Sequence, residues 1–270
     1  MGKQRKFRQL AAGFLFLIQG VFLASCDKNQ NFNLLSVQED KRLGLQVSQE
    51  IASKPAEFPL LDESQYPAAY QKIREITDKL LNSGKLAYRN EFVWQVKIIR
   101  DDNTKNAFCT PGGYIYVYTG LIKYLDTEDQ LAGVMGHEIA HADLRHTSRQ
   151  LTKSYGYQFL INAILGENAG AIAQIALGLK TLQNSREFER EADDKSVELL
   201  SVTSYACNGT AGFFEKMIAE GNNPSVPQWL STHPNPDNRV EAINKKADAL
   251  QCSKMPLSPN TYAAFKAMLP

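Results

Sequence analysis

The feature of this sequence that most constrains its fold is the run GHEIAHADLRH at residues 136–146. It holds three of the four histidines in the 270-residue chain. In a helix, His137 and His141 project from one face about one turn apart, and Glu138 lies beside the first of them. A helix over residues 127–150 therefore presents two imidazoles and a carboxylate close together, which is a candidate metal site.

Glu138 falls on the apolar side of this predicted helix, close to Leu131 and Val134. A lone carboxylate is costly to bury, so it needs a purpose or a partner. The pattern HExxH on a helix supplies one, because two neutral imidazoles bind Zn²⁺ and the adjacent glutamate takes a proton from the attacking water. A solvated polar helix is the alternative, and the uncharged neighbours Gly136 and Ile139 argue against it.

A catalytic zinc ion needs three protein ligands and one open position for water. On the helical wheel His146 points well away from the other two histidines, which excludes it as a ligand from this helix. In residues 185–200 only two acids, Glu189 and Asp193, fall on the apolar face, while the remaining acids form a solvated stripe. We expect Glu189 to be the third zinc ligand and Asp193 to accept the second ring N–H of a ligand histidine. The alternative is that every acid of this helix faces solvent.

Four motifs occur in a fixed order: NAFCTPGGYIYVYTGL, HEIAH, a glutamate 48 residues after His141 within EREAD, and THPNPDNR. Together they resemble the HtpX, BepA and CAAX prenyl protease family of gluzincin metallopeptidases, from about residue 36 to 250. The resemblance implies that His137, His141 and Glu189 bind one Zn²⁺ ion and that Glu138 is the general base. The chain departs from the family pattern at Cys109, where a small apolar residue is usual, and it shows neither a multi-span membrane region nor a tetratricopeptide extension.

The run YIYVYT at residues 114–119 predicts a strand of strict alternation. Metallopeptidases of the resembled type lay an extended substrate on an exposed sheet edge, where main-chain hydrogen bonds hold it. The alternative is an interior strand whose tyrosines only pack. The predicted substrate-binding residues at this edge are Tyr114, Ile115, Tyr116 and Val117.

His233 lies in STHPNPDNR, just before the last predicted helix. The resemblance implies a catalytic position near the zinc, either as a donor to the oxyanion or as a fourth ligand in a resting state. A surface histidine is the ordinary alternative. Arg239 is expected to brace this loop against the carboxylates of the site, with a surface salt bridge as its alternative. Residues 155–182 predict two short helices, which we interpret as a lid over the cleft rather than as a packing layer.

The N-terminus predicts export. Four basic residues and no acid precede an apolar stretch that ends in LASC, which resembles a bacterial lipobox with Cys26 as the acylated residue. A plain signal peptide or anchor with an incidental cysteine is the alternative. The predicted organisation is a signal peptide at 1–25, a lipidated cysteine and tether at 26–35, a zinc metallopeptidase domain at 36–254 and a C-terminal tail at 255–270.

Composition excludes some function classes. Without residues 1–25 the chain keeps 26 of its 30 Lys and Arg against 29 Asp and Glu, a net charge of −3, which gives no support for nucleic-acid binding. Export permits a disulfide, and Cys207 with Cys252 is the preferred pair, which leaves Cys109 free.

We therefore expect an α+β fold: a mainly helical, zincin-like metallopeptidase domain with a small β-sheet beside the HExxH helix. The predicted function is a lipid-anchored zinc metalloendopeptidase of the bacterial cell envelope, in the periplasm. The resemblance implies that its substrates are unfolded or misassembled envelope proteins. Two alternatives stay open: a chaperone-like strand-binding protein with a latent zinc site, and a zinc hydrolase of a non-peptide ester or amide.

Overall fold

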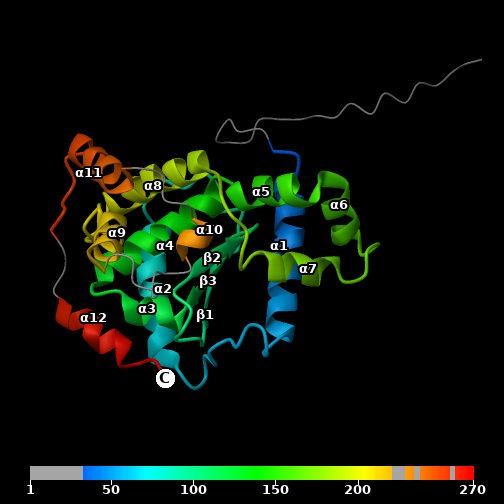
Figure 1. Ribbon diagram of the computed structural model, residues 1–270, viewed down its shortest axis with the longest axis horizontal. Helices are drawn as coiled ribbons and strands as arrows, with labels where there is room; N and C mark the ends of the chain where they lie inside the picture. Colours follow the sequence, from blue (N-terminus) through cyan, green and yellow to red (C-terminus); the bar gives the residue numbers. More distant parts are fainter. Residues whose placement is uncertain (1–32, 221–228, 234–237, 256–258) are drawn as a thin grey trace, which may run out of the picture.

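A small mixed sheet lies between two groups of helices in the computed structural model, which describes residues 33–220, 229–233, 238–255 and 259–270 (Figure 1). The strands are β1 (Gln95–Ile99), β2 (Ala107–Thr110) and β3 (Tyr114–Tyr118). Their order is β1-β3-β2, with β3 parallel to β1 and antiparallel to β2. The expected mainly helical α+β fold is confirmed. The helices are α1 (Val37–Ser53), α2 (Pro67–Leu81), α3 (Thr119–Tyr124), α4 (Glu128–Asp143), α5 (His146–Tyr155), α6 (Tyr157–Leu165), α7 (Ala171–Gly178), α8 (Arg186–Leu200), α9 (Gly209–Glu220), α10 (Trp229–Thr232), α11 (Arg239–Ala249) and α12 (Pro259–Lys266).

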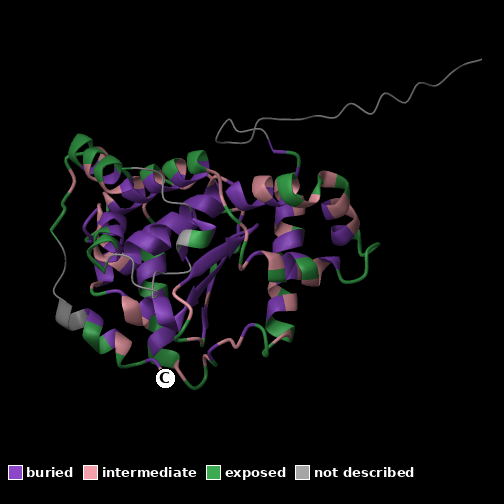
Figure 2. Ribbon diagram, in the orientation of Figure 1, coloured by how far each residue is buried: buried purple, intermediate pink, exposed green. Residues whose placement is uncertain are grey.

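The alternation of β3 divides the core into two clusters. Ile115 and Val117 join the larger cluster, which contains the buried side chains of α2, α4, α8 and α9. Tyr116 joins the smaller cluster, which contains those of α1, α6 and α7. Figure 2 shows the strands and α4 as the most completely buried elements. Both faces of the sheet are therefore covered.

The central helix α4 begins and packs as its sequence dictates. Thr127 accepts a hydrogen bond from the backbone N–H of Gln130, whose side chain returns to the Thr127 backbone, and this capping box begins the helix. Two glycines then allow its neighbours to approach closely. A Cβ at Gly133 would lie 2.2 Å from the backbone nitrogen of Thr210 beside it in α9, and one at Gly136 would lie 2.8 Å from the hydroxyl of Ser196 in α8.

Residues 155–182 form a packing layer, which corrects the interpretation as a lid. Ile164 of α6 and Ile175 of α7 are buried in the smaller cluster together with Val47 and Ile51 of α1. The apolar residues of α6 and α7 are needed to cover α1 and the face of the sheet that carries the tyrosines of β3. Only the segment after α7 reaches the functional cleft described below. No helix among the described residues has both the length and the apolarity to cross a membrane.

The substrate strand was placed wrongly by the sequence. Residues 114–117, including Tyr114, Ile115, Tyr116 and Val117, belong to β3, which pairs with β1 on one side and with β2 on the other. Neither side of β3 is an open edge. The tyrosines pack in the core, and the short strand β2, which had no distinct signal in the sequence, takes the edge position instead.

The C-terminal segment is folded, so residues 255–270 are not simply a tail. Helix α12 lies within them, and Tyr262, Phe265 and Leu269 are buried in the larger cluster. The Tyr262 hydroxyl donates to the backbone oxygen of Ile122 at 2.6 Å. Apolar residues spaced three and four apart hold this segment against the core.

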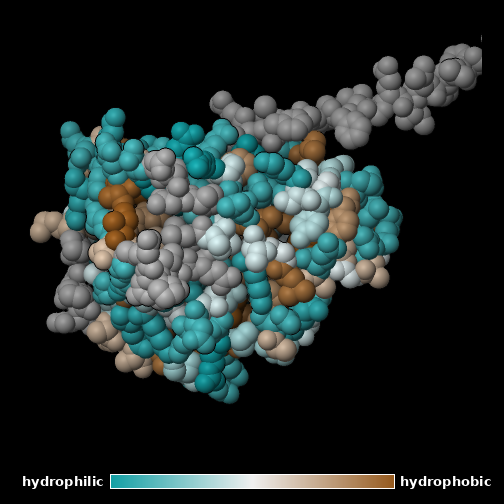
Figure 3. All heavy atoms as spheres, viewed as in Figure 1, coloured by the Kyte–Doolittle hydropathy of each residue, from teal (hydrophilic) through white to brown (hydrophobic). Residues whose placement is uncertain are grey.

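Cys207 and Cys252 form a disulfide, as preferred from the sequence, and Cys109 is free and buried. The expected signal peptide, Cys26 and most of the expected tether lie outside the described residues. Figure 3 shows that the visible face of the folded body is mostly hydrophilic, with apolar side chains in small separate patches.

Candidate active site

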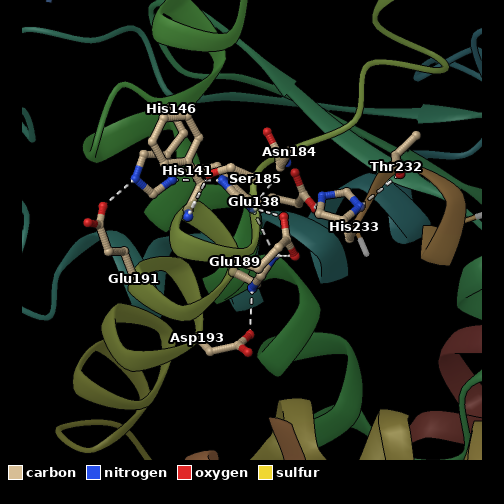
Figure 4. Close-up of polar contacts among 12 residues, drawn as sticks. Glu138, His141, His146, Asn184, Ser185, Glu189, Glu191, Asp193, Thr232 and His233 are labelled. Carbon is tan, nitrogen blue, oxygen red and sulfur yellow. Dashed lines mark hydrogen bonds and ion pairs between the residues drawn. The ribbon is translucent and has the colours of Figure 1, made fainter. Parts of the chain in front are cut away.

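Four side chains from three parts of the chain converge at one buried point. His137 and His141 come from α4, Glu189 comes from the first turn of α8, and His233 directly follows α10. One ligand atom from each lies within 4.8 Å of the others. The Nε2 atoms of the first two histidines are 2.9 Å apart, and the two Glu189 oxygens lie 3.3 and 3.4 Å from them. Figure 4 shows His141, Glu189 and His233 directed toward a common centre.

The donor set fits one zinc ion. Two imidazoles and a carboxylate with a further open or exchangeable position are the ligands of catalytic zinc sites. Both oxygens of the Glu189 carboxylate are buried and accept no hydrogen bond within the described part of the chain. Arg239 lies 3.1 Å from one of these oxygens without making a hydrogen bond to it, so a metal ion bound by these side chains would supply the partner that the carboxylate lacks.

The charges of these groups in the metal-free protein favour a proton or a cation at the same point. Burial acts to lower the pKa of His137, but Asp193 and Glu189 outweigh it and raise that pKa to about 9. Burial lowers the pKa of His141 to about 3, which keeps this imidazole neutral. Burial also acts to raise the pKa of Glu189, but His233 and the ligand histidines hold it well below its usual range. The metal-free cluster therefore holds an ionised carboxylate beside a protonated His137, whose proton a zinc ion would displace.

Asp193 and Arg239 surround the cluster on the α8 side. Asp193 Oδ1 lies 2.9 Å from the Nδ1 atom of His137, the nitrogen that faces away from the cluster. Arg239 donates to both oxygens of Asp193, at 2.6 and 2.7 Å, and its Nη1 lies 3.1 Å from Glu189. One guanidinium thus neutralises two buried carboxylates, one of which orients a histidine.

Glu138 lies beside the cluster with its carboxylate turned toward α10. Its Oε1 accepts a hydrogen bond from the indole N–H of Trp229 at 3.3 Å and lies 3.3 Å from Nε2 of His233. Burial acts to raise the pKa of Glu138, but His233 and the two α4 histidines lower it to about 2. This carboxylate is therefore ionised, as a proton acceptor must be.

Sequence reasoning missed Trp229, whose ring stacks on that of His233 with centroids 4.2 Å apart. The available signal was its spacing of four residues from His233 in WLSTH, which puts both rings on one side of a helical turn. Asn184 was also missed. Its side-chain nitrogen lies 3.5 Å from Nε2 of His141.

His146 does not point away from the other histidines, which corrects the sequence interpretation. The helix α4 ends at Asp143, and Arg145 adopts a left-handed conformation with φ 59°, so a single wheel does not extend to residue 146. The chain turns back and places Nδ1 of His146 2.9 Å from Nδ1 of His141. His146 lies outside the four-residue metal cluster but touches one of its members. Its Nε2 in turn lies 2.8 Å from Glu191, a residue expected to face only solvent.

A cleft leads to the cluster. Its walls include Phe108 and Cys109 of the edge strand β2, Leu179 and Leu182 of the segment after α7, and the residues Glu138, His141, Thr147, Asn184, Thr232 and His233. Burial raises the pKa of the Cys109 thiol, so this cysteine is neutral. The side of the cleft nearest the sheet is therefore formed by β2. The structure brings together every residue predicted for the metal cluster, and the catalytic roles of these residues stay predictions.

Comparison with known proteins agrees with this geometry. The chain is 27% identical over 240 residues to the mitochondrial metalloendopeptidase OMA1 of Schizosaccharomyces pombe, which covers 87% of this chain and 69% of that protein. It is 32% identical over 164 residues to a putative beta-barrel assembly-enhancing protease of Vibrio cholerae, covering 56% and 34% of the two chains. For the Escherichia coli beta-barrel assembly-enhancing protease the identity is 29% over 173 residues, covering 59% and 36%.

The chain thus matches about a third of the two bacterial proteases and about two thirds of the yeast protein. The model of Peptidase family M48 matches residues 67–247, which include His137, His141, Glu189 and His233. Since this match covers more than half of the chain and contains a cluster that fits one zinc ion, the protein belongs to peptidase family M48 of zinc metalloendopeptidases.

Proposed function

We propose that this protein is a zinc endopeptidase that cleaves unfolded or misassembled polypeptides of the bacterial cell envelope. The observation that carries the proposal is the buried cluster of His137, His141 and Glu189, with Glu138 adjacent and a cleft leading to it. A binding protein has no need of an ionised carboxylate beside a metal site, whereas hydrolysis requires a proton acceptor there.

Each residue has a definite task in this reaction. His137, His141 and Glu189 would hold the zinc ion, whose Lewis acidity would polarise the scissile carbonyl and make a water molecule more acidic. Glu138 takes the proton of the attacking water on its carboxylate and later passes it to the leaving nitrogen. Asp193 accepts the Nδ1 proton of His137 and so keeps Nε2 of that ring free for the metal.

The position of β2 supports a revised substrate site. Since β2 lies at the edge of the sheet and forms one wall of the cleft, an extended peptide would add to it as a further strand. The backbone N–H of Tyr118 donates to the oxygen of Asn106, and the register alternates from there. By that alternation the backbone N–H and C=O of Cys109 point away from β3. The C=O accepts a hydrogen bond from the Thr147 hydroxyl at 3.4 Å, so the N–H is the group that we propose a substrate strand would contact.

The substitution Cys109→Pro tests this edge, because proline removes the outward N–H without removing a hydrogen bond to β3. Cys109→Ala is the matched control, since it changes the same side chain and keeps the N–H. We expect KM for an unfolded protein substrate to rise in Cys109→Pro relative to Cys109→Ala, with kcat less affected. Equal KM values for the two variants would remove β2 from the substrate site.

The proposed hydrolysis is tested with Glu138→Gln, which keeps the shape of the side chain and removes its basicity. We expect the variant to bind zinc but to cleave a permanently unfolded test protein at least about 100-fold more slowly, the size expected for loss of a general base. The measurement is the appearance of new peptide N-termini. Zinc content of both proteins is the control for an intact site.

The same experiment separates the alternatives. A chaperone-like binding protein would protect an aggregating client equally well with or without Glu138, and neither protein would release peptides. A hydrolase of another class would turn over small esters or amides but not peptides, so a panel of both substrate types is measured in parallel. Either result would overturn the proposed peptidase activity.

His233 has two possible roles, and its contacts support the resting-state role. Its ligand atom lies in the metal cluster, and its Nε2 is 3.3 Å from the carboxylate oxygen of Glu138. In this position His233 competes with the attacking water for the metal site. It also engages the carboxylate of Glu138, which must be free to accept the proton of that water. His233→Ala is therefore expected to raise peptidase activity, whereas a role as oxyanion donor requires activity to fall.

Lipid anchoring through Cys26 and a periplasmic location are part of the same proposal, supported by the LASC sequence after an apolar stretch. The substrate class is supported by the name of the two bacterial relatives, beta-barrel assembly-enhancing protease.

Expression of the full chain and of Cys26→Ser in a bacterium, followed by labelling with a radioactive fatty acid, tests the lipid anchor. We expect the unchanged chain to carry the fatty-acid label and to associate with the membrane, and we expect Cys26→Ser to do neither. Labelling of both would exclude Cys26 as the acylated residue.

A further inference from the structure

His146 is a buried histidine that the hydrolytic reaction does not use. It is 0% exposed and lies outside the metal cluster, yet its ring joins that cluster to the surface of α8. Nδ1 of His146 is 2.9 Å from Nδ1 of His141, and its Nε2 is 2.8 Å from Oε2 of Glu191. Figure 4 shows the three side chains in this order, with Glu191 at the outer end.

The plane of the His146 ring is held by its neighbours. It stacks on Phe188 with centroids 4.4 Å apart and an angle of 3° between the rings. The guanidinium of Arg149 lies 4.3 Å from the centroid of the same phenyl ring. Both nitrogens of His146 are therefore directed at these partners: turning the ring out of its plane would lose the stacking contact, and flipping it within the plane would lose both hydrogen bonds.

The chain of contacts allows only one direction of hydrogen bonding that is compatible with a metal site. An ionised glutamate only accepts, so the Nε2 of His146 must donate to Glu191. In a neutral imidazole the other nitrogen then lacks a proton, so Nδ1 of His146 accepts from Nδ1–H of His141. This leaves the lone pair of His141 on Nε2, the atom that faces Glu189 at 3.3 Å.

We propose that Glu191 and His146 form a two-residue relay that fixes the tautomer and orientation of His141, so that a carboxylate at the protein surface sets the metal affinity of the buried site. Both are positioning residues, because neither touches the metal cluster's centre or a substrate. Asp193 lies next to Nδ1 of His137 and can accept its proton directly. For His141 the acceptor is the ring of His146, which connects it to the carboxylate of Glu191. The outer residue of the relay is partly exposed, with 35% of the Glu191 side chain accessible.

This inference rests on the zinc site of the proposed function but not on peptide cleavage, so its readout is zinc affinity. Glu191→Lys tests the direction of the relay. An ammonium can only donate, so it forces the His146 proton onto Nδ1, which then donates to Nδ1 of His141 and leaves the proton of His141 on the metal-binding nitrogen. We expect zinc affinity, measured by competition with a chelating dye, to fall by about 10- to 100-fold, as for other partners of ligand histidines.

The matched control is Glu187→Lys, which makes the same change of charge one turn earlier on the exposed side of α8. We expect it to leave zinc affinity close to that of the unchanged protein. If both lysine variants weaken zinc binding equally, the effect is a long-range charge effect and the relay is refuted. It is also refuted if Glu191→Lys binds zinc as tightly as the unchanged protein.

Substitutions of His146 provide a second test. His146→Asn places an amide oxygen near the position of Nδ1, where it can still accept from His141, whereas His146→Ala leaves Nδ1–H of His141 without an acceptor. We expect His146→Asn to keep most of the zinc affinity that His146→Ala loses. A purely structural role predicts the reverse order or equal losses, because both variants remove the stacking contact with Phe188.

The tautomer itself can be observed. The chain has only four histidines, so long-range ¹H–¹⁵N spectra of the zinc-loaded protein can be assigned by substitution. We expect His146 to carry its proton on Nε2 in the unchanged protein and on Nδ1 in Glu191→Lys. A proton on Nδ1 in the unchanged protein would overturn the relay. Failure of the unchanged protein to bind zinc would instead overturn the proposed function, so the two failures are distinguishable.

Discussion

Arg239 lies against two buried carboxylates, Asp193 and Glu189, on the α8 side of the metal cluster. It donates to both oxygens of Asp193 and lies 3.1 Å from Glu189, while its guanidinium carbon lies 4.2 Å from the centroid of Phe214. Removal of one partner from a buried ion pair leaves an uncompensated charge, which costs far more than an exposed pair contributes. The residue therefore affects folding as well as the site.

We predict that Arg239→Met destabilises the zinc-free protein by about 3–5 kcal/mol, since it removes the guanidinium partner that the buried Asp193 and Glu189 share. The free energy of unfolding in urea measures the effect. Lys246→Met is the control, because it breaks a partly exposed pair with Glu198 between the same helices, α11 and α8. That change should cost less than about 1 kcal/mol. Similar losses for the two variants would contradict the buried-pair interpretation.

At the scale of elements, α4 positions the site because two other helices approach its glycine side. Helix α8 brings Glu189 to the histidines, and Ser196 of that helix donates to the backbone oxygen of Gly133 at 3.0 Å. The N-terminal turn of α9 lies against the same residue. Close packing of these three helices leaves no room for a side chain at the crossing, so the position of Glu189 depends on a residue that carries no chemistry.

We predict that Gly133→Ala destabilises the protein by about 1–3 kcal/mol, because the added methyl group would lie 2.2 Å from the Thr210 backbone and force the helices apart. Zinc affinity should fall as well, since α8 carries a ligand. Gly212→Ala in α9 is the control: its methyl group meets only the Gln130 side chain, at 3.4 Å. A stable Gly133→Ala protein with unchanged zinc affinity would show that the crossing tolerates expansion.

At the scale of the whole molecule, the cluster ties together three segments that are far apart in the chain: α4, α8 and the residue after α10. The disulfide between Cys207 and Cys252 links the segment just before α9 with the segment just after α11. The disulfide therefore adds a covalent link between α9 and α11, which pack against α4 and α8 respectively.

We predict that a chelator abolishes peptidase activity and lowers the thermal midpoint, and that added zinc restores both. A ligand that binds only the folded state stabilises it by RT ln(1 + [L]/Kd), about 4 kcal/mol at a thousandfold excess over Kd. Differential scanning calorimetry with and without zinc measures the shift. Glu189→Ala lacks a proposed ligand and should show a much smaller shift. An equal shift in that variant would mean that zinc stabilises the protein at another site.

The local properties of this protein could be predicted from its sequence. The helix predicted from residue 127 does begin there, with Thr127 as the N-cap of α4, and the apolar face of residues 185–200 separates Glu189 and Asp193 from the more exposed acids. These features depend on residues three and four apart, and helical periodicity is a property of the local chain. For the same reason the histidine pair and its adjacent glutamate identify the chemistry before any contact between helices is known.

Only the tertiary structure decided how distant segments meet. Strand β2 takes the sheet edge, and His146 turns back onto His141 after the left-handed Arg145, which breaks the helical periodicity that would have placed it elsewhere. Trp229 reaches Glu138 across 91 positions of the chain. Such contacts depend on the packing of whole elements against one another, and a local pattern contains no information about which element will be the neighbour.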